Sequence, residues 1–232
     1  MPLPDSSPAD LDEAEDLRDA TVRSLGWAQV GYALVGTHPA VARTLHLNGP
    51  VVGPLLREAV LEDGETFRLP RGVIGAGTGL AFLLGRSFPS SDEEALTVEN
   101  AASACVACRL DLTSLGRRTV APILLDENIA TADLGLAVVH VAGPWVEGWA
   151  DAGLATGQAS LTIDGNVVAR GCGHDPLAAV VWLARRLADR SSGLGAGDLV
   201  AAGSCTGLAQ VLPGQILVAG FGDLGTISLR LC

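Results

Sequence analysis

The sequence predicts an α+β protein, because its helical and strand-like segments come in runs and do not alternate regularly. In the last third, short strands separated by glycine turns precede and follow one strong helix, which supports the same class. No stretch of about eighteen apolar residues occurs, so no membrane-spanning helix is expected. We expect a disordered N-terminus over residues 1–9 and a single domain over residues 10–232.

The first half of the chain is expected to contain several helices. Apolar residues recur at helical spacing from Asp10 onward, and this first helix should end near Gly31 or Gly36. Ser91 as N-cap and Glu94 three residues later form a capping box for another helix. The later helical segments expected in this half are residues 39–47, 54–61 and 91–102.

Strands are expected where short apolar runs lie between turn residues. Upstream of residue 150 these are residues 65–69, 80–84 and 134–141. Further on, strands over residues 160–163 and 167–170 flank the hairpin turn Asp164-Gly165-Asn166. Residues 176–190 carry one apolar face and predict a long helix. The remaining strands are expected over residues 198–202, 215–219 and 226–231.

The composition argues against several functional classes. A formal net charge of −11 would repel nucleic acid. The start of the chain is acidic and rich in proline, unlike a signal peptide, so we expect a cytoplasmic protein. All fifteen basic residues are arginine, which excludes a lysine Schiff base, a lysine general base and a phosphate-binding lysine. A GC-rich genome would also replace lysine by arginine.

Several motifs in the last third resemble one enzyme family. They are Gly173-His174-Asp175-Pro176-Leu177-Ala178 with Val181-Trp182-Leu183-Ala184, Gly203-Ser204-Cys205-Thr206-Gly207, and Phe221-Gly222-Asp223-Leu224-Gly225-Thr226. Upstream, Gly36-Thr37-His38-Pro39 and residues 80–86 continue the series, so the resemblance spans roughly residues 20–231. The pattern is similar to the bacterial 2-keto-4-pentenoate hydratases and 4-oxalocrotonate decarboxylases of the fumarylacetoacetate hydrolase-like superfamily. This resemblance implies a rolled, mixed β-sheet core with peripheral helices, and assembly into homo-oligomers or with a related enzyme.

The resemblance also implies a divalent metal held by three acidic side chains, together with an acid–base lysine. This chain departs from the family at those positions. The first two glutamates fall on Gly77 and Gly79, the third falls on Cys108, and the lysine falls on Ala33. We therefore expect no oxygen-ligand metal site, because hard cations need oxygen ligands, and no cofactor.

The first of three interpretations is a lyase-like enzyme, of hydratase or decarboxylase type, with altered, magnesium-independent chemistry. Its small-molecule substrate would be a 2-oxo acid or a similar enolisable compound. Histidine can exchange a proton near neutral pH, and the hydroxyl and backbone N–H groups of residues 203–207 suit a carboxylate. The candidate catalytic residues are His174, Glu127 and His38, and the candidate substrate-binding residues are Asn128, Ser204, Cys205 and Thr206.

The second interpretation is a zinc site made of Cys105, Cys108, Cys172 and His174, whose thiolate and imidazole groups suit that metal. Against it, Cys105 and Cys108 lie in an apolar segment, where a buried cysteine is an ordinary small core residue. The third interpretation is a non-catalytic partner or ligand-binding subunit that retains the fold. Neither a nucleic acid nor a membrane is expected as a partner.

Overall fold

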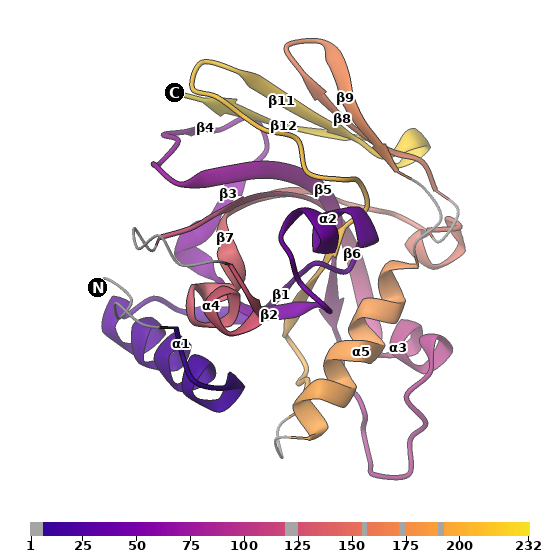
Figure 1. Cartoon of the computed structure of the whole chain (residues 1–232). Helices are drawn as coiled ribbons and strands as arrows, with labels where there is room; N and C mark the ends of the chain where they lie inside the picture. Colours follow the sequence, from indigo (N-terminus) through magenta and orange to yellow (C-terminus); the bar gives the residue numbers. More distant parts are fainter. Residues whose placement is uncertain (1–6, 119–124, 155–156, 172–174, 190–192) are drawn as a thin grey trace.

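The computed structural model describes residues 7–118, 125–154, 157–171, 175–189 and 193–232 (Figure 1). Within these residues, two mixed β-sheets curl into a half-barrel with helices around it. The larger sheet has the strand order β2-β1-β10-β5-β6-β7-β3, and the smaller has the order β4-β12-β11-β8-β9. This is the α+β architecture of rolled mixed sheets and peripheral helices that was expected. None of the described helices is long and apolar enough to cross a membrane.

The strands of the larger sheet come from both halves of the chain: β1 (Gln29–Val35), β2 (Val51–Leu56), β3 (Val60–Glu62), β5 (Val73–Leu84), β6 (Cys105–Gly116), β7 (Ala137–Trp145) and β10 (Leu199–Ser204). The smaller sheet consists of β4 (Thr66–Phe67), β8 (Ala159–Ile163), β9 (Asn166–Gly171), β11 (Ile216–Gly220) and β12 (Thr226–Leu231). The α-helices are α1 (Leu11–Leu25), α2 (Pro39–Thr44), α3 (Val98–Ala104), α4 (Glu127–Ala132) and α5 (Pro176–Ala188). Short 3₁₀ turns cover Arg57–Ala59, Leu134–Leu136, Trp149–Asp151 and Gly222–Leu224.

The long antiparallel pair β5 and β6 forms the centre of the larger sheet. Its register sets Gly77 opposite Thr113 and Gly79 opposite Asp111. On one side, β10 pairs with β5 and also runs parallel to β1, so the end of β1 lies close to the middle of β5. Helix α5 packs beside α3, and α1 packs against α4 (Figure 1). The sheet therefore brings chain segments from residues 35, 78, 113 and 204 together.

The last third matches its predicted elements closely. The hairpin of β8 and β9 turns at Asp164 and Gly165, whose φ angles are 49° and 81°. Aspartate and glycine tolerate this left-handed conformation, which is why the turn could be predicted. Helix α5 begins at Pro176 after an N-cap by Asp175, and its apolar face is buried. The three later strands also lie where they were expected.

The predicted helices in the first half differ from the structure in extent or kind: the one over residues 39–47 ends at Thr44, and the others differ more. The first helix ends earlier, because Gly26 adopts a left-handed φ of 65° and its N–H donates to the carbonyl of Val22. Residues 29–35 are therefore free to form β1. Residues 54–61 form the end of β2, a 3₁₀ turn and most of β3 instead of a helix. Every residue of β2 is buried between β1 and the 134–136 turn, so tertiary burial overrides the local pattern.

The capping box at Ser91 does not form. The Glu94 carboxylate instead accepts hydrogen bonds from the Arg86 guanidinium and from Ser90 N, and α3 begins later with Thr97 as its N-cap. The strand expected over residues 134–141 begins at Ala137, because Leu134, Gly135 and Leu136 all have left-handed φ angles. Residues 1–6 of the expected disordered segment lie outside the described residues.

Candidate functional site

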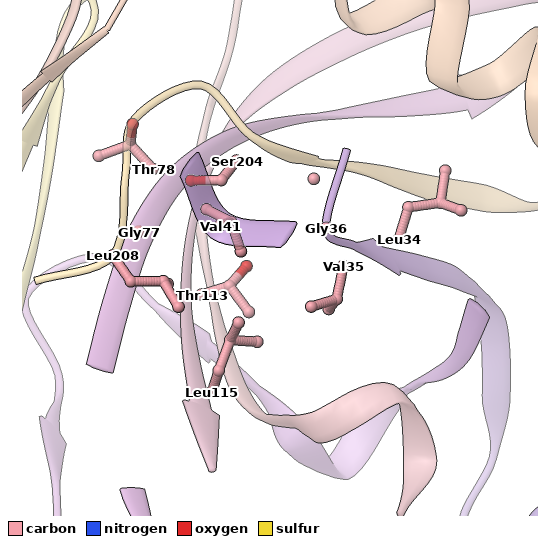
Figure 2. A pocket seen from close by; sticks show the side chains of 11 residues that line it. Leu34, Val35, Gly36, Val41, Gly77, Thr78, Thr113, Leu115, Ser204 and Leu208 are labelled. Carbon is pink, nitrogen blue, oxygen red and sulfur yellow. The ribbon is translucent and has the colours of Figure 1, made fainter. Parts of the chain in front are cut away.

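A narrow cavity opens between the end of β1, helix α2, the middle of β5 and β6, and the loop after β10 (Figure 2). Its enclosed volume is about 20 Å³, well below that of typical ligand sites, and it widens only at its open mouth. Among the described residues its lining is apolar, hydroxyl-bearing or glycine: Leu34, Val35, Val41, Leu115, Leu208, Thr78, Thr113, Ser204, Gly36, Gly77 and Gly203. A small ligand with an apolar body and one or two polar atoms matches these walls.

The wall formed by the end of β10 depends on a local irregularity. The pairing of β10 with β5 shifts register between Ala201 and Ser204, and such bulges re-aim side chains. Gly203 lies in this bulge with a φ of 86°, and a Cβ atom there would lie 2.1 Å from Thr37 Oγ1. Only glycine allows both this left-handed φ angle and this close approach to Thr37. The bulge lets Ser204 line the cavity (Figure 2).

Hydroxyl groups fasten the loop after β10 to the central strand β5. The buried Thr206 hydroxyl accepts from Thr78 N and is also 3.3 Å from Thr78 Oγ1. The Ser204 hydroxyl donates to the carbonyl of Thr206. Thr206 therefore supports the wall from behind, and the hydroxyls of Ser204 and Thr78, two residues that line the cavity, are hydrogen-bonded to it.

Behind the hydroxyl of Thr113 lies a buried acid–base pair. Thr113 Oγ1 donates to Asp111 Oδ2 at 2.6 Å and lies 3.1 Å from His140 Nδ1. His140 Nδ1 is also 3.2 Å from both carboxylate oxygens of Asp111. The other ring nitrogen, His140 Nε2, is buried and has no hydrogen-bond partner among the described residues. Since Thr113 lines the cavity, one hydroxyl group separates the cavity from this pair.

The pair keeps its carboxylate ionised. Burial by itself would raise the pKa of Asp111. The charge of His140, hydrogen bonds from His140 and Thr113 and the more distant charge of Arg109 together outweigh burial, so the pKa lies below its ordinary value. At neutral pH Asp111 is therefore negatively charged, and it holds the Thr113 hydroxyl by accepting a hydrogen bond from it.

The buried cysteines are poor nucleophiles and poor metal ligands. Burial and then the nearby Asp111 charge raise the pKa of Cys205 to about 12, and burial raises the pKa of Cys105 to about 12 despite the Arg86 charge. Burial also raises the pKa of Cys108. Thiols in such surroundings stay protonated near neutral pH. Among the described residues no group of three or more His, Cys, Asp or Glu side chains could hold a metal.

The candidate residues chosen from the sequence lie in different places. Ser204 lines the cavity, with Cys205 and Thr206 beside it. His38 is the N-cap of α2, where its Nδ1 accepts from Ala40 N at 3.1 Å. The candidates on α4 do not line the cavity: Glu127 accepts from Asn48 N, and Asn128 donates to the carbonyl of Pro8. His174 and Cys172 lie outside the described residues, so their proposed roles stay predictions.

Sequence reasoning did not select Asp111, Thr113 or His140 as site residues. A signal was present, because a carboxylate and an imidazole inside apolar strands each need a partner when buried. Asp111 follows Leu110 in β6, and His140 lies between Val139 and Val141 in β7. What the sequence lacked was the register that pairs Thr113 with His140.

The residues present do not fit a divalent metal held by three carboxylates. A Cβ atom at Gly79 would lie 2.3 Å from the carbonyl oxygen of Gly203, and one at Gly77 would lie 2.6 Å from Ser204 Oγ. Cys108 lies opposite Phe82, is buried in the core and offers no carboxylate. Asp111 is the acidic side chain that lies opposite Gly79. The space in which two glutamates would stand is occupied by the β10 bulge.

No family model matches the chain. Its fold is similar to that of 4-oxalocrotonate decarboxylase from Pseudomonas putida G7, complexed with magnesium and adipate, with a TM-score of 0.85 at 19% identity over 96% of this chain and 86% of that one. It is also similar to 5-carboxymethyl-2-hydroxymuconate delta-isomerase from Mycobacterium smegmatis (TM-score 0.59, 16% identity, 88% of this chain, 79% of that one). Fumarylpyruvate hydrolase from Pseudomonas aeruginosa, in complex with Mn²⁺ and pyruvate, gives a TM-score of 0.57 at 17% identity over 86% of this chain and 88% of that one.

Proposed function

Starting from the fumarylacetoacetate hydrolase-like fold that these comparisons establish, we propose that the chain is a lyase-type enzyme for a small 2-oxo acid or a similar enolisable compound. The substrate binds in the cavity beside Thr113. One observation carries this proposal: Thr113 lines the cavity, and its hydroxyl is hydrogen-bonded to the buried Asp111–His140 pair. Enzymes with a similar fold process small oxo acids, which supports the substrate class.

The chemistry follows from proton transfer. Interconversion of a carbonyl compound and its enol moves a proton between oxygen and carbon, and a positioned acid–base group accelerates such a step. In ketonisation, Thr113 can accept the proton of a bound enol hydroxyl while its own proton moves to Asp111, and the enolate carbon takes a proton from a water molecule. The hydroxide that this water leaves is neutralised when Asp111 returns its proton through Thr113. His140 stabilises the charge of Asp111 and holds its orientation. Ser204 and Thr78 are placed to bind an oxygen atom of the same substrate.

The proposed acid–base role of Thr113 is tested by carbon–hydrogen exchange. Purified protein in D₂O containing a chelator should exchange the hydrogens next to the carbonyl of small oxo compounds, followed by proton NMR. Thr113→Val, which removes the hydroxyl and keeps the shape, should slow this exchange by about 10²-fold or more. Thr113→Ser keeps the hydroxyl and should retain most of the rate.

Equal rates in wild type and Thr113→Val would contradict the proposal, provided that both variants melt at similar temperatures. A protein that binds such compounds without exchanging them would instead be the ligand-binding subunit considered as the alternative. The same measurement on His174→Ala and Glu127→Gln would test the other predicted catalytic residues.

A further inference from the structure

We infer that the cavity selects an uncharged substrate: a small, mostly apolar carbonyl or enol compound that carries no carboxylate. This inference rests on the proposed function, because it concerns the same cavity and the same reaction. It keeps the enolisable compounds of the proposed function and excludes the 2-oxo acids because of their charge. In this it departs from the acids named for the similar structures.

The walls of the cavity contain no charged side chain among the described residues. A carboxylate that leaves water needs a cation or several aimed donors, and without them its burial is strongly unfavourable. Five apolar side chains instead offer contact to a hydrocarbon body: Leu34, Val35, Val41, Leu115 and Leu208. The hydroxyls of Thr78, Thr113 and Ser204 already donate within the protein, so towards a ligand they offer acceptor oxygens, which suit an enol hydroxyl and not a carboxylate.

Among the described residues, neither a carboxylate-bound metal ion nor an arginine side chain is available to neutralise a carboxylate in the cavity. Carboxylate ligands for a metal ion are missing at positions 77 and 79, and the bulge at Gly203 and Ser204 occupies their space. The arginine whose charge acts on Asp111 is Arg109, and its guanidinium lies over the ring of Trp145, 5.3 Å from the centroid. Arg109 does not line the cavity.

The buried pair behind the wall offers no free cation to an acid. Asp111 is negative, and it is separated from the cavity by the single hydroxyl of Thr113. His140 is the group hydrogen-bonded to that charge, so it is not available to a second carboxylate through the same nitrogen. Unlike a carboxylate, a neutral carbonyl compound needs no counter-charge here and can use the same proton path.

A matched pair of probes tests the inference on the full chain: 2-oxopentanoate and 2,3-hexanedione. The dione replaces the carboxylate by an acetyl group of similar shape. Titration calorimetry should show tighter binding of the dione, by about tenfold or more, because only the acid must lose its hydration without a partner. Leu208 lines the cavity and is partly exposed, so two substitutions at this position can be compared. One adds a positive charge, and the other adds only bulk.

Leu208→Arg should reverse the preference by supplying a cation, and Leu208→Trp should weaken both probes by filling the space. Tighter binding of 2-oxopentanoate to the wild type, weakened by Leu208→Trp, would overturn the inference. Failure of both probes to bind would overturn it together with the proposed function. If the dione binds but its hydrogens do not exchange, the proposed function fails and the charge preference stands. If 2-oxopentanoate exchanges its hydrogens faster than 2,3-hexanedione, the proposed function stands and the inferred charge preference fails.

Discussion

At the scale of single residues, Asp111 links stability to pH. Its pKa is lowered in the folded protein, so its contribution is complete above the ordinary carboxyl pKa of about 4 and is lost as the pH falls through the folded value. Asp111→Asn should therefore cost about 3 kcal/mol of unfolding free energy at pH 5, and this difference should shrink towards pH 3. Urea unfolding at both pH values measures it.

The pH window isolates the carboxyl group, because histidine in the unfolded chain is already protonated at pH 5. Asp92→Asn is a control: Asp92 is exposed, so its substitution should change stability by less than about 0.5 kcal/mol at either pH. A penalty for Asp111→Asn that stays constant from pH 5 to pH 3 would show that Asp111 contributes no pH dependence.

The candidate site could be predicted in part. Ser204, Cys205 and Thr206 were found because they are adjacent in the sequence and belong to a resembling motif. Thr113 and His140 are 27 positions apart and meet only through the register of β6 and β7. A register shift between Ser114 and Leu115 adds to the difficulty, because a slip of one residue would point the side chains to the opposite face.

At the scale of elements, α1 is held to α5 by a buried glutamate. Glu15 is 8% exposed, and its Oε1 lies 3.0 Å from Arg186 Nη2. Glu15→Gln should lower the unfolding free energy by about 1–3 kcal/mol, because a buried charge-assisted hydrogen bond is weakened. Hydrogen exchange should show faster exchange in α1. Asp16→Asn, on the exposed side of the same helix, should leave the exchange unchanged, and equal effects of both variants would refute the anchoring role.

Elements with local signals were predicted well. The β8–β9 turn and helix α5 are specified by residues inside each segment, such as Asp164 and Pro176. By contrast, the Glu94 carboxylate accepts a hydrogen bond from Arg86 and therefore does not take part in a capping box. Strand β2 forms because its residues are buried on both sides. Such partners depend on the assembled fold, so a local pattern could not reveal them.

At the scale of the whole molecule, the fold could be predicted from the resemblance, whereas the strand order could not be read from the sequence. The order β1-β10-β5 joins residues about 170 and 120 positions apart. Assembly into homo-oligomers, or with a related enzyme, stays a prediction, and light scattering after size-exclusion chromatography would test it.

Metal removal should leave the whole molecule intact. The described residues offer no set of three metal-binding side chains, so no metal is expected to stabilise the folded state by binding it. Dialysis against a chelator should therefore shift the melting temperature by less than about 1 °C. A drop of several degrees that zinc restores would support the alternative zinc site at Cys105, Cys108, Cys172 and His174.

The close approach of Gly79 to the carbonyl of Gly203 also restricts how this protein can evolve. Any side chain at position 79 would overlap that carbonyl, so a mutation towards glutamate is harmful until β10 has moved. Moving β10 first would remove the bulge that lets Ser204 line the cavity. Each change is unfavourable without the other. Positions 79 and 203 are therefore epistatically coupled, because a side chain at position 79 is tolerated only together with a change in β10.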